Sequence, residues 1–318
     1  MFKHLKKQFA TSVILVVLVV VFSLLAPGFF SVNNFISLTR QIAILGVVST
    51  GMTLVLIAGG LDLSVGSQIS LIGVLVATLI VNAGVNPILA CIIGLICSTI
   101  IGYLNSVLII KTNMWPMITT IAMMQVLQGV AYIITGGLPV YGMPDYMKAI
   151  GQGYLGPIPI PVIIMVVIMA LGSFILNKTY FGRYLYAIGS NAEAARLSGI
   201  NITKIKTIVY MICGLLAGIG GLIMMGRVAS GQPKAGATFE MDVLTACVVG
   251  GVGLNGGKGK MSGVAIGVLI MGVLSNGLGV MGVSEYYQLV CKGAVLLLAV
   301  GFDGVQQMRA KSKKTVVV

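Results

Sequence analysis

Long apolar runs recur along the whole chain, and they constrain the fold more than any other feature of the sequence. Each run of roughly 17 to 25 residues is long enough to cross about 30 Å of hydrocarbon. The chain is 58% hydrophobic and only 8% charged, whereas soluble domains carry about 25% charged residues. The period-2 alternation of a transmembrane barrel is absent, so the runs predict spanning helices. We therefore expect an all-α polytopic membrane protein.

Ten spans are predicted, with nine or eleven as alternatives because glycine interrupts several segments. No hydrophilic domain separates them, so residues 1–318 are expected to form a single transmembrane domain. The expected spans are 11–26, 41–58, 65–82, 87–110, 115–135, 160–177, 207–226, 241–253, 262–283 and 286–302.

The net charge of +13 is distributed as the positive-inside rule predicts when the chain starts in the cytoplasm. Lysine and arginine then gather in the inner segments, and both termini are cytoplasmic. The partner of this charge is therefore the membrane surface and not nucleic acid. The first apolar run is followed by Pro27-Gly28-Phe29-Phe30 instead of a small-residue cleavage pattern, so we expect it to remain as the first span.

A polar island at about 178–206 interrupts the apolar pattern. Ser190 and Glu193 have the spacing of a capping box, in which each side chain bonds to the other residue's N–H. Helix formers follow, and Gly199 stands where a glycine would end the helix. On a cytoplasmic loop, a short capped helix is expected to contact a cytoplasmic partner.

No catalytic or cofactor site is expected in this chain. Gly251 to Gly256 match GxGxxG, but membrane spans flank them in place of a strand and a helix of a βαβ unit. The only histidine, His4, lies in the basic N-terminal tail, and the cysteines lack metal-site spacing. We expect the cysteines to be buried packing thiols.

The segment Gly59–Ser67 predicts a broken helix. Asp62 or Ser64 can cap the helix that follows, and direct contact with a solute is the alternative role. The residues 55–66 also align weakly with 246–257, which suggests an internal repeat and two related halves.

Polar side chains inside spans are costly in lipid, so they are candidates for a solute path. Interhelical hydrogen bonding explains them equally well. Glu285, Gln288 and Lys292 are expected to interact with one another, and Glu240 and Asp242 to cap the eighth span. The candidates for the solute path or the broken helix are Asp62, Ser64, Asn105, Gln125, Gln128 and Asn276.

An ordered series of motifs resembles the membrane permease subunit of bacterial ABC importers for simple sugars, the ribose/xylose/arabinose/galactoside type. It is most similar to the ribose-transporting members. Val252-Gly253 departs from the family, which often has Thr-Ser there. The motifs are Pro27–Phe30 with Asn33-Asn34, Gly51–Val55, Gly60–Ser67, Gly182–Tyr184 with Ala187–Gly189, Asn191–Asn201, Gln232-Pro233, Phe239–Asp242, Gly256–Gly259, and Gly282–Ser284 with Tyr286–Gln288.

The resemblance implies a type II importer permease in the bacterial inner membrane, without its own catalytic site. Implied partners are a second permease copy, a cytoplasmic tandem-domain ABC ATPase that holds ATP and Mg, and a periplasmic or lipid-anchored sugar-binding protein. The solute would be a monosaccharide, with ribose the first choice. The coupling helix would use Ser190, Asn191, Glu193, Ala194, Ala195, Arg196, Gly199 and Ile200 as contact surface.

Two alternatives stay open. The same importer architecture could carry another sugar, a nucleoside or a furanosyl signal molecule. An ion-coupled secondary carrier is a different class, and it would use a proton or sodium gradient in place of ATP. The absence of a series of intramembrane carboxylates counts against that carrier.

Overall fold

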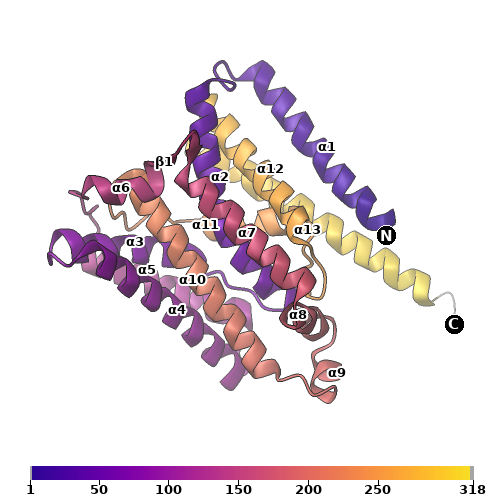
Figure 1. Ribbon diagram of the computed structural model, residues 1–318. Coiled ribbons are helices and arrows are strands. Elements are labelled where there is room, and N and C mark those ends of the chain that lie inside the picture. The colour runs from indigo at the N-terminus through magenta and orange to yellow at the C-terminus, as the bar shows by residue number, and fades with distance from the viewer. Residues whose placement is uncertain (1, 316–318) are drawn as a thin grey trace.

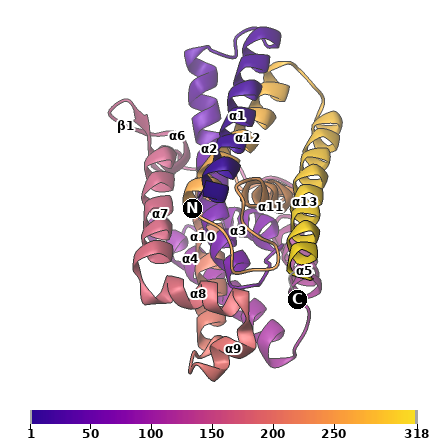
Figure 2. The same cartoon turned by 90° about the vertical axis from the view of Figure 1, so that its right-hand side faces the viewer.

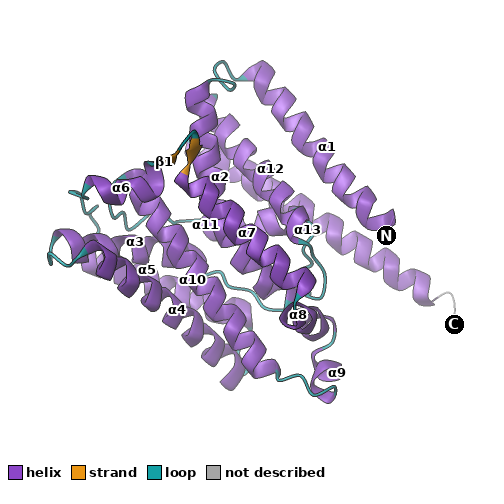
Figure 3. Cartoon of the chain, viewed as in Figure 1, coloured by secondary structure: helices purple, strands orange, loops and turns teal. Residues whose placement is uncertain are grey.

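The computed structural model describes residues 2–315, and it folds into a bundle of helices with one short hairpin (Figures 1 and 3). The helices are α1 (Phe2–Leu25), α2 (Val32–Ile57), α3 (Val65–Val81), α4 (Pro87–Lys111), α5 (Pro116–Thr135), α6 (Asp145–Gln152), α7 (Ile160–Lys178), α8 (Tyr180–Ser190), α9 (Ala192–Leu197), α10 (Ile202–Val228), α11 (Phe239–Val249), α12 (Met261–Val280) and α13 (Glu285–Thr315).

Each of the ten predicted ranges coincides with a helix. Six helices within residues 2–315 have the length and apolar composition to cross a membrane, namely α2, α4, α5, α7, α10 and α12. The other predicted ranges lie on α1, α3, α11 and α13. Of these, α11 has 11 residues and ends at Val249, four residues before the predicted end of that span.

Helix α10 lies at the centre of the bundle, where it packs against α2, α3, α4 and α6. The first and last helices lie at the periphery: α1 packs on α12, and α13 packs mainly on α11 (Figures 1 and 2). The core therefore forms between α2 and α10, with α11 and α12 completing it.

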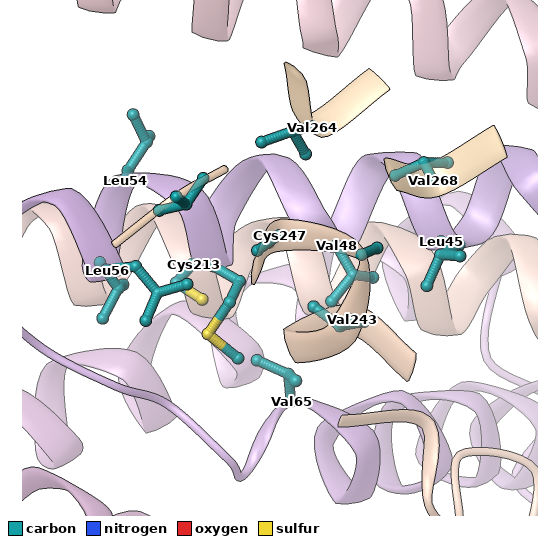
Figure 4. Close-up of a cluster of buried hydrophobic side chains, with 14 of the residues drawn as sticks. Leu45, Val48, Leu54, Leu56, Val65, Cys213, Val243, Cys247, Val264 and Val268 are labelled. Atoms are coloured by element: carbon teal, nitrogen blue, oxygen red, sulfur yellow. The ribbon is translucent and has the colours of Figure 1, made fainter. Parts of the chain in front are cut away.

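Apolar side chains from helices far apart in sequence fill this core. Figure 4 shows members of this cluster from four helices: Leu54 of α2, Val65 of α3, Cys213 of α10 and Cys247 of α11. Both thiols are buried and free, as expected for cysteines that pack as small apolar side chains, whereas Cys91, Cys97 and Cys291 are only partly buried. Between spanning helices such packing stabilises through van der Waals contact, because lipid tails are as apolar as these side chains.

The two ends of the bundle carry different structures, which the second view confirms (Figure 2). At one end lie α6 and an antiparallel hairpin of β1 (Tyr154–Leu155) and β2 (Ile158–Pro159). At the other end lie α8 and α9. The sequence did not predict α6, the hairpin or α8. The basic residues of the two tails, such as Lys3 and Arg309, lie outside the side chains that the structure describes.

Candidate functional site

Helix α9 is capped at its N-terminus by Asn191. Its Oδ1 accepts from the N–H of Ala194 at 3.0 Å, and its extended backbone is typical of an N-cap. The predicted capping box is therefore wrong. Ser190 cannot cap α9 because α8 continues through it. Glu193 does not reach back either, since its Oε1 pairs with the guanidinium of Arg196 at 2.5 Å.

The predicted stop at Gly199 is confirmed. Gly199 has φ +84°, its N–H donates to the carbonyl of Arg196 at 3.0 Å, and the N–H of Ile200 donates to the carbonyl of Ala195 at 3.1 Å. These two bonds form a Schellman motif, which satisfies carbonyls that the helix end leaves free. Both ends of α9 are thus closed, and its backbone conformation is fixed.

The side chains of α9 divide into an attached face and a free face. Ala195 is only 4% exposed and packs in the core cluster, and Ile200 packs beside it. Leu197, which sequence reasoning missed, is 79% exposed. The free face consists of Leu197 with Asn191, Glu193, Ala194, Arg196 and Gly199, all exposed, and Ser190 at the end of α8 is exposed too.

The free face carries one exposed ion pair, between Arg196 and Glu193. The hydrogen bond from Arg196 to Glu193 raises the pKa of the guanidinium. Because both side chains are exposed, the pair adds little to stability. The exposed leucine next to this ion pair gives the free face an apolar point on an otherwise polar surface.

Helix α8 holds α9 against the bundle. Thr179 caps it by accepting from the N–H of Gly182 at 3.2 Å, and Leu185 and Ile188 are buried beneath it. The hydroxyl of Tyr186 donates to the carbonyl of Gly259 at 2.8 Å, and burial raises the pKa of this phenol. Helix α8 is therefore tied to the loop between α11 and α12.

The break after α2 carries a buried polar cluster. The Oδ1 of Asp62 accepts from the N–H of Ser64 at 3.0 Å and from its Oγ at 2.6 Å. The Nδ2 of Asn105 on α4 lies 3.3 and 3.4 Å from the carboxylate oxygens and 2.9 Å from Ser64 Oγ. Ser64 is the residue before α3, but neither side chain caps that helix, so the predicted capping role is wrong.

Three further residues complete the cluster, and sequence reasoning missed them. The Nε2 of Gln68 donates to Ser64 Oγ at 2.9 Å. Thr120 Oγ1 accepts from the N–H of Leu63 at 3.1 Å, and the Tyr210 hydroxyl bonds to both backbone groups of Leu61. Of these three residues, only Gln68 could have been found from the sequence, because it lies one helical turn after Ser64 and therefore on the same side of the helix.

The buried cluster holds the break in place in this conformation. Asp62, Ser64 and Asn105 are each 0% exposed, so no solute can touch them here. The bonds join the break to α3, α4, α5 and α10. These bonds satisfy most of the buried polar groups, but Oε1 of Gln68 and Oδ1 of Asn105 have no hydrogen-bond partner among the described residues.

The other solute-path candidates lie elsewhere, so the six residues do not form one site. Gln128 donates to the carbonyl of Pro233 at 2.6 Å. Asn276 and Asn34 exchange two amide hydrogen bonds of 2.8 and 2.9 Å, which join α12 to α2. Gln125 is exposed on α5.

The predicted interaction among Glu285, Gln288 and Lys292 is wrong. The Nζ of Lys292 pairs with Asp242 of α11 at 2.7 Å, and Gln288 donates to the carbonyl of Val283 at 2.8 Å. Glu240 and Asp242 both lie in the first turn of α11, as predicted, although Thr238 occupies the N-cap position and Asp242 also pairs with Lys292. Within the described part of the chain, no group of three His, Cys, Asp or Glu side chains could hold a metal ion.

Residues 34–300 match the model of a family described as branched-chain amino acid transport system / permease component. The chain belongs to this permease family. The permease is 45% identical to the ribose import permease protein RbsC of Bacillus subtilis over 291 residues, which cover 91% of this chain and 90% of that relative.

Two other relatives are similar over nearly the full chain. The ribose import permease protein RbsC of Escherichia coli K12 is 42% identical over 297 residues, covering 92% of each chain. The L-arabinose transport system permease protein AraH of Escherichia coli K12 is 36% identical over 315 residues, covering 99% of this permease and 95% of that relative. No solved structure matches the permease significantly.

These similarities confirm the resemblance to ABC sugar-importer permeases that the motifs predicted. With six helices long and apolar enough to span, the permease is an integral inner-membrane protein. Its relatives are transport subunits.

Proposed function

We propose that this permease is the membrane subunit of an ABC importer that carries ribose across the bacterial inner membrane. The observation that supports it most is the 45% and 42% identity to two ribose import permeases over about nine-tenths of each chain. The arabinose relative is more distant, at 36%. Substrate transport is thus the role, and ATP hydrolysis belongs to a partner.

The proposed partner on the cytoplasmic side is a tandem-domain ABC ATPase, which would bind ATP and Mg. Its contact surface on the permease is the free face of α9, within the loop 178–206. Leu197 supports this assignment because its side chain is 79% exposed on a capped helix that lies outside the predicted spans, where lipid would not cover it. Ala195 and Ile200 would instead transmit force, since they attach α9 to the bundle.

We propose that all ten predicted ranges cross or enter the membrane within a single domain, residues 1–318. Both termini would then lie in the cytoplasm together with α8 and α9. The end with α6 and the hairpin would face the periplasm, where a periplasmic or lipid-anchored sugar-binding protein docks. The opposite placement of these two ends in the bundle supports this orientation (Figure 2).

A second permease copy is the proposed neighbour of α5. Gln125 lies halfway along this helix, and its side chain is exposed. An amide that faces hydrocarbon leaves hydrogen-bonding groups unsatisfied, at several kcal/mol for each group. We infer that a second copy covers this face, and that Gln125 lines the solute path between the copies with Gln128 beside it.

The test is transport by the purified complex in proteoliposomes with its ATPase and binding protein. We expect ATP-dependent uptake of labelled ribose in preference to arabinose. The variant Leu197→Asp should lose both uptake and co-purification of the ATPase. Leu155→Asp, an exposed leucine at the other end of the bundle, should keep the ATPase bound.

Three outcomes would contradict the proposal. Uptake of another solute but not of ribose would overturn the substrate. Uptake that persists without ATP and collapses with the proton or sodium gradient would indicate a secondary carrier. Normal assembly of the Leu197→Asp complex would overturn the contact surface.

A further inference from the structure

Three backbone segments meet at glycines beside the coupling surface. They are the turn after α2 at Gly59, the end of α8 at Gly189, and the loop between α11 and α12 at Gly256 and Gly257. A Cβ atom placed on Gly256 would lie 2.9 Å from the Cα atoms of both Gly59 and Gly189. These four glycines are called the glycine junction below.

The junction is in direct backbone contact throughout. A Cβ on Gly189 would collide with the carbonyl of Ile57 and with the N–H of Gly257. That N–H donates to the same Ile57 carbonyl at 2.9 Å. Apart from Ser190, whose Oγ lies beside Gly257, backbone meets backbone at the junction, so a displaced segment pushes directly on its neighbours.

The junction connects the coupling surface to the buried polar cluster. Gly189 lies two residues before Asn191, which caps α9, so α9 and Gly189 share a short rigid path through α8. Gly59 begins the break that carries Asp62 and Ser64. Both side chains accept from Asn105 of α4, and Ser64 also accepts from Gln68 of α3. On the third side, Gly256 and Gly257 lie in the loop that leads into α12.

We propose that Gly59, Gly189, Gly256 and Gly257 are positioning residues for transport: a displacement of α9 by the ATPase reaches the break after α2 and the loop before α12 through their backbone contact. This inference rests on the proposed coupling role of α9 and adds the route beyond that surface. A side chain at the junction would separate the segments and let α9 move without moving the break.

Close packing alone does not make a glycine part of the route from α9, because other glycines in the bundle are equally crowded. Gly267 of α12 faces the carbonyl of Ala246 so closely that a Cβ would collide with it. That contact joins α11 to α12 and does not touch α8 or α9. Gly267 is therefore a matched control for loss of stability without loss of coupling.

The test compares Gly189→Ala with Gly267→Ala in the full complex with ATPase and binding protein. Neither glycine has a positive φ, so alanine changes only the space at each position. The measurements are the thermal midpoint and the number of ribose molecules transported per ATP hydrolysed. We expect both variants to lower the midpoint, and only Gly189→Ala to lower the transport ratio, by about tenfold, within the range of coupling between sites.

A second pair of variants serves if Gly189→Ala does not fold. Gly256 and Gly28 have φ +81° and +87°, but nothing lies within 4 Å of a Cβ on Gly28. Both alanine variants therefore carry the same backbone strain, and only Gly256→Ala disturbs the junction. We expect a lowered transport ratio in Gly256→Ala alone.

The outcomes separate this inference from the proposed function. A wild-type complex without ATP-dependent transport would overturn the proposed function. Normal wild-type transport with an unchanged ratio in both junction variants would overturn only the junction. Loss of ATPase binding in Gly189→Ala would also overturn it, because the proposal places the defect after that contact.

Discussion

The Nζ of Lys292 on α13 lies 2.7 Å from the Oδ2 of Asp242 on α11, with side chains only 20% and 16% exposed. The other ion pairs of the described residues, Asp145–Lys148 and Glu193–Arg196, are local pairs on exposed surface. Because α13 packs mainly on α11, this pair anchors the last helix to the bundle.

Replacing Lys292 by methionine should destabilise the permease by about 3–5 kcal/mol, because it leaves Asp242 as an uncompensated, largely buried charge. The double variant Lys292→Met/Asp242→Asn should recover most of this loss. Thermal unfolding in lipid nanodiscs measures both, and Lys148→Met should change the midpoint little. A single variant as stable as the double variant would show that the pair does not anchor α13.

The amide pair Asn34–Asn276 should behave as one coupled unit. Asn276→Ala removes both hydrogen bonds to Asn34, although Asn34 keeps its 2.8 Å bond to the carbonyl of Phe29. We expect a loss of about 1–3 kcal/mol. In a double-mutant cycle with Asn34→Ala, the coupling energy should be about 0.5–3 kcal/mol. Additive effects would mean that the amides do not interact in the membrane.

Asn105 should be essential for the buried polar cluster. Asn105→Leu removes the amide donor near the Asp62 carboxylate and should cost about 3 kcal/mol, the upper range for hydrogen bonds to charged groups. Asn105→Asp should be worse, because it places a second carboxylate beside the first. Asn82→Leu, at an exposed asparagine, is the control. Wild-type stability of Asn105→Asp would contradict the bonding described.

Gly199→Ala should loosen α9 through its backbone alone. Gly199 has φ +84°, and a Cβ there would meet nothing within 4 Å, so the cost is the roughly 1–2 kcal/mol of a left-handed conformation. Hydrogen exchange of the α9 amides should increase, and Gly199→Asn should show a smaller increase. Gly129→Ala, in a helix and equally open, should leave exchange in α9 unchanged.

The apolar runs were sufficient to predict where the main helices lie, because hydrocarbon thickness sets their length. The capping box failed for a local reason. Ser190 and Asn191 are adjacent and both suit an N-cap, and the choice between them depended on how far α8 extends. Helix α8 itself was missed, although Thr179 carried the start signal that its structure uses.

The position of helix α9 was predicted, but not its orientation. A six-residue helix is too short for its periodicity to identify the buried face. In the structure the small side chain of Ala195 is buried and the larger side chain of Leu197 is exposed, the reverse of what their sizes suggest. The partner of Lys292 was missed because Asp242 lies 50 residues away in sequence. Contacts of this range depend on tertiary packing, which local pattern does not encode.

The buried polar cluster has a consequence for biosynthesis. Asp62 leaves the ribosome 43 residues before Asn105, and Leu61 leaves it 149 residues before Tyr210. At about 5–20 residues per second, the second interval lasts roughly 7 to 30 s. Until Asn105 has been made, the Asp62 carboxylate lacks this donor, and until Tyr210 has been made, both backbone groups of Leu61 lack their partner, so hydrocarbon is a poor environment for this turn. Helix α3 therefore reaches its final position only after α10 has been made, and until then the insertion machinery must shelter the turn that precedes it.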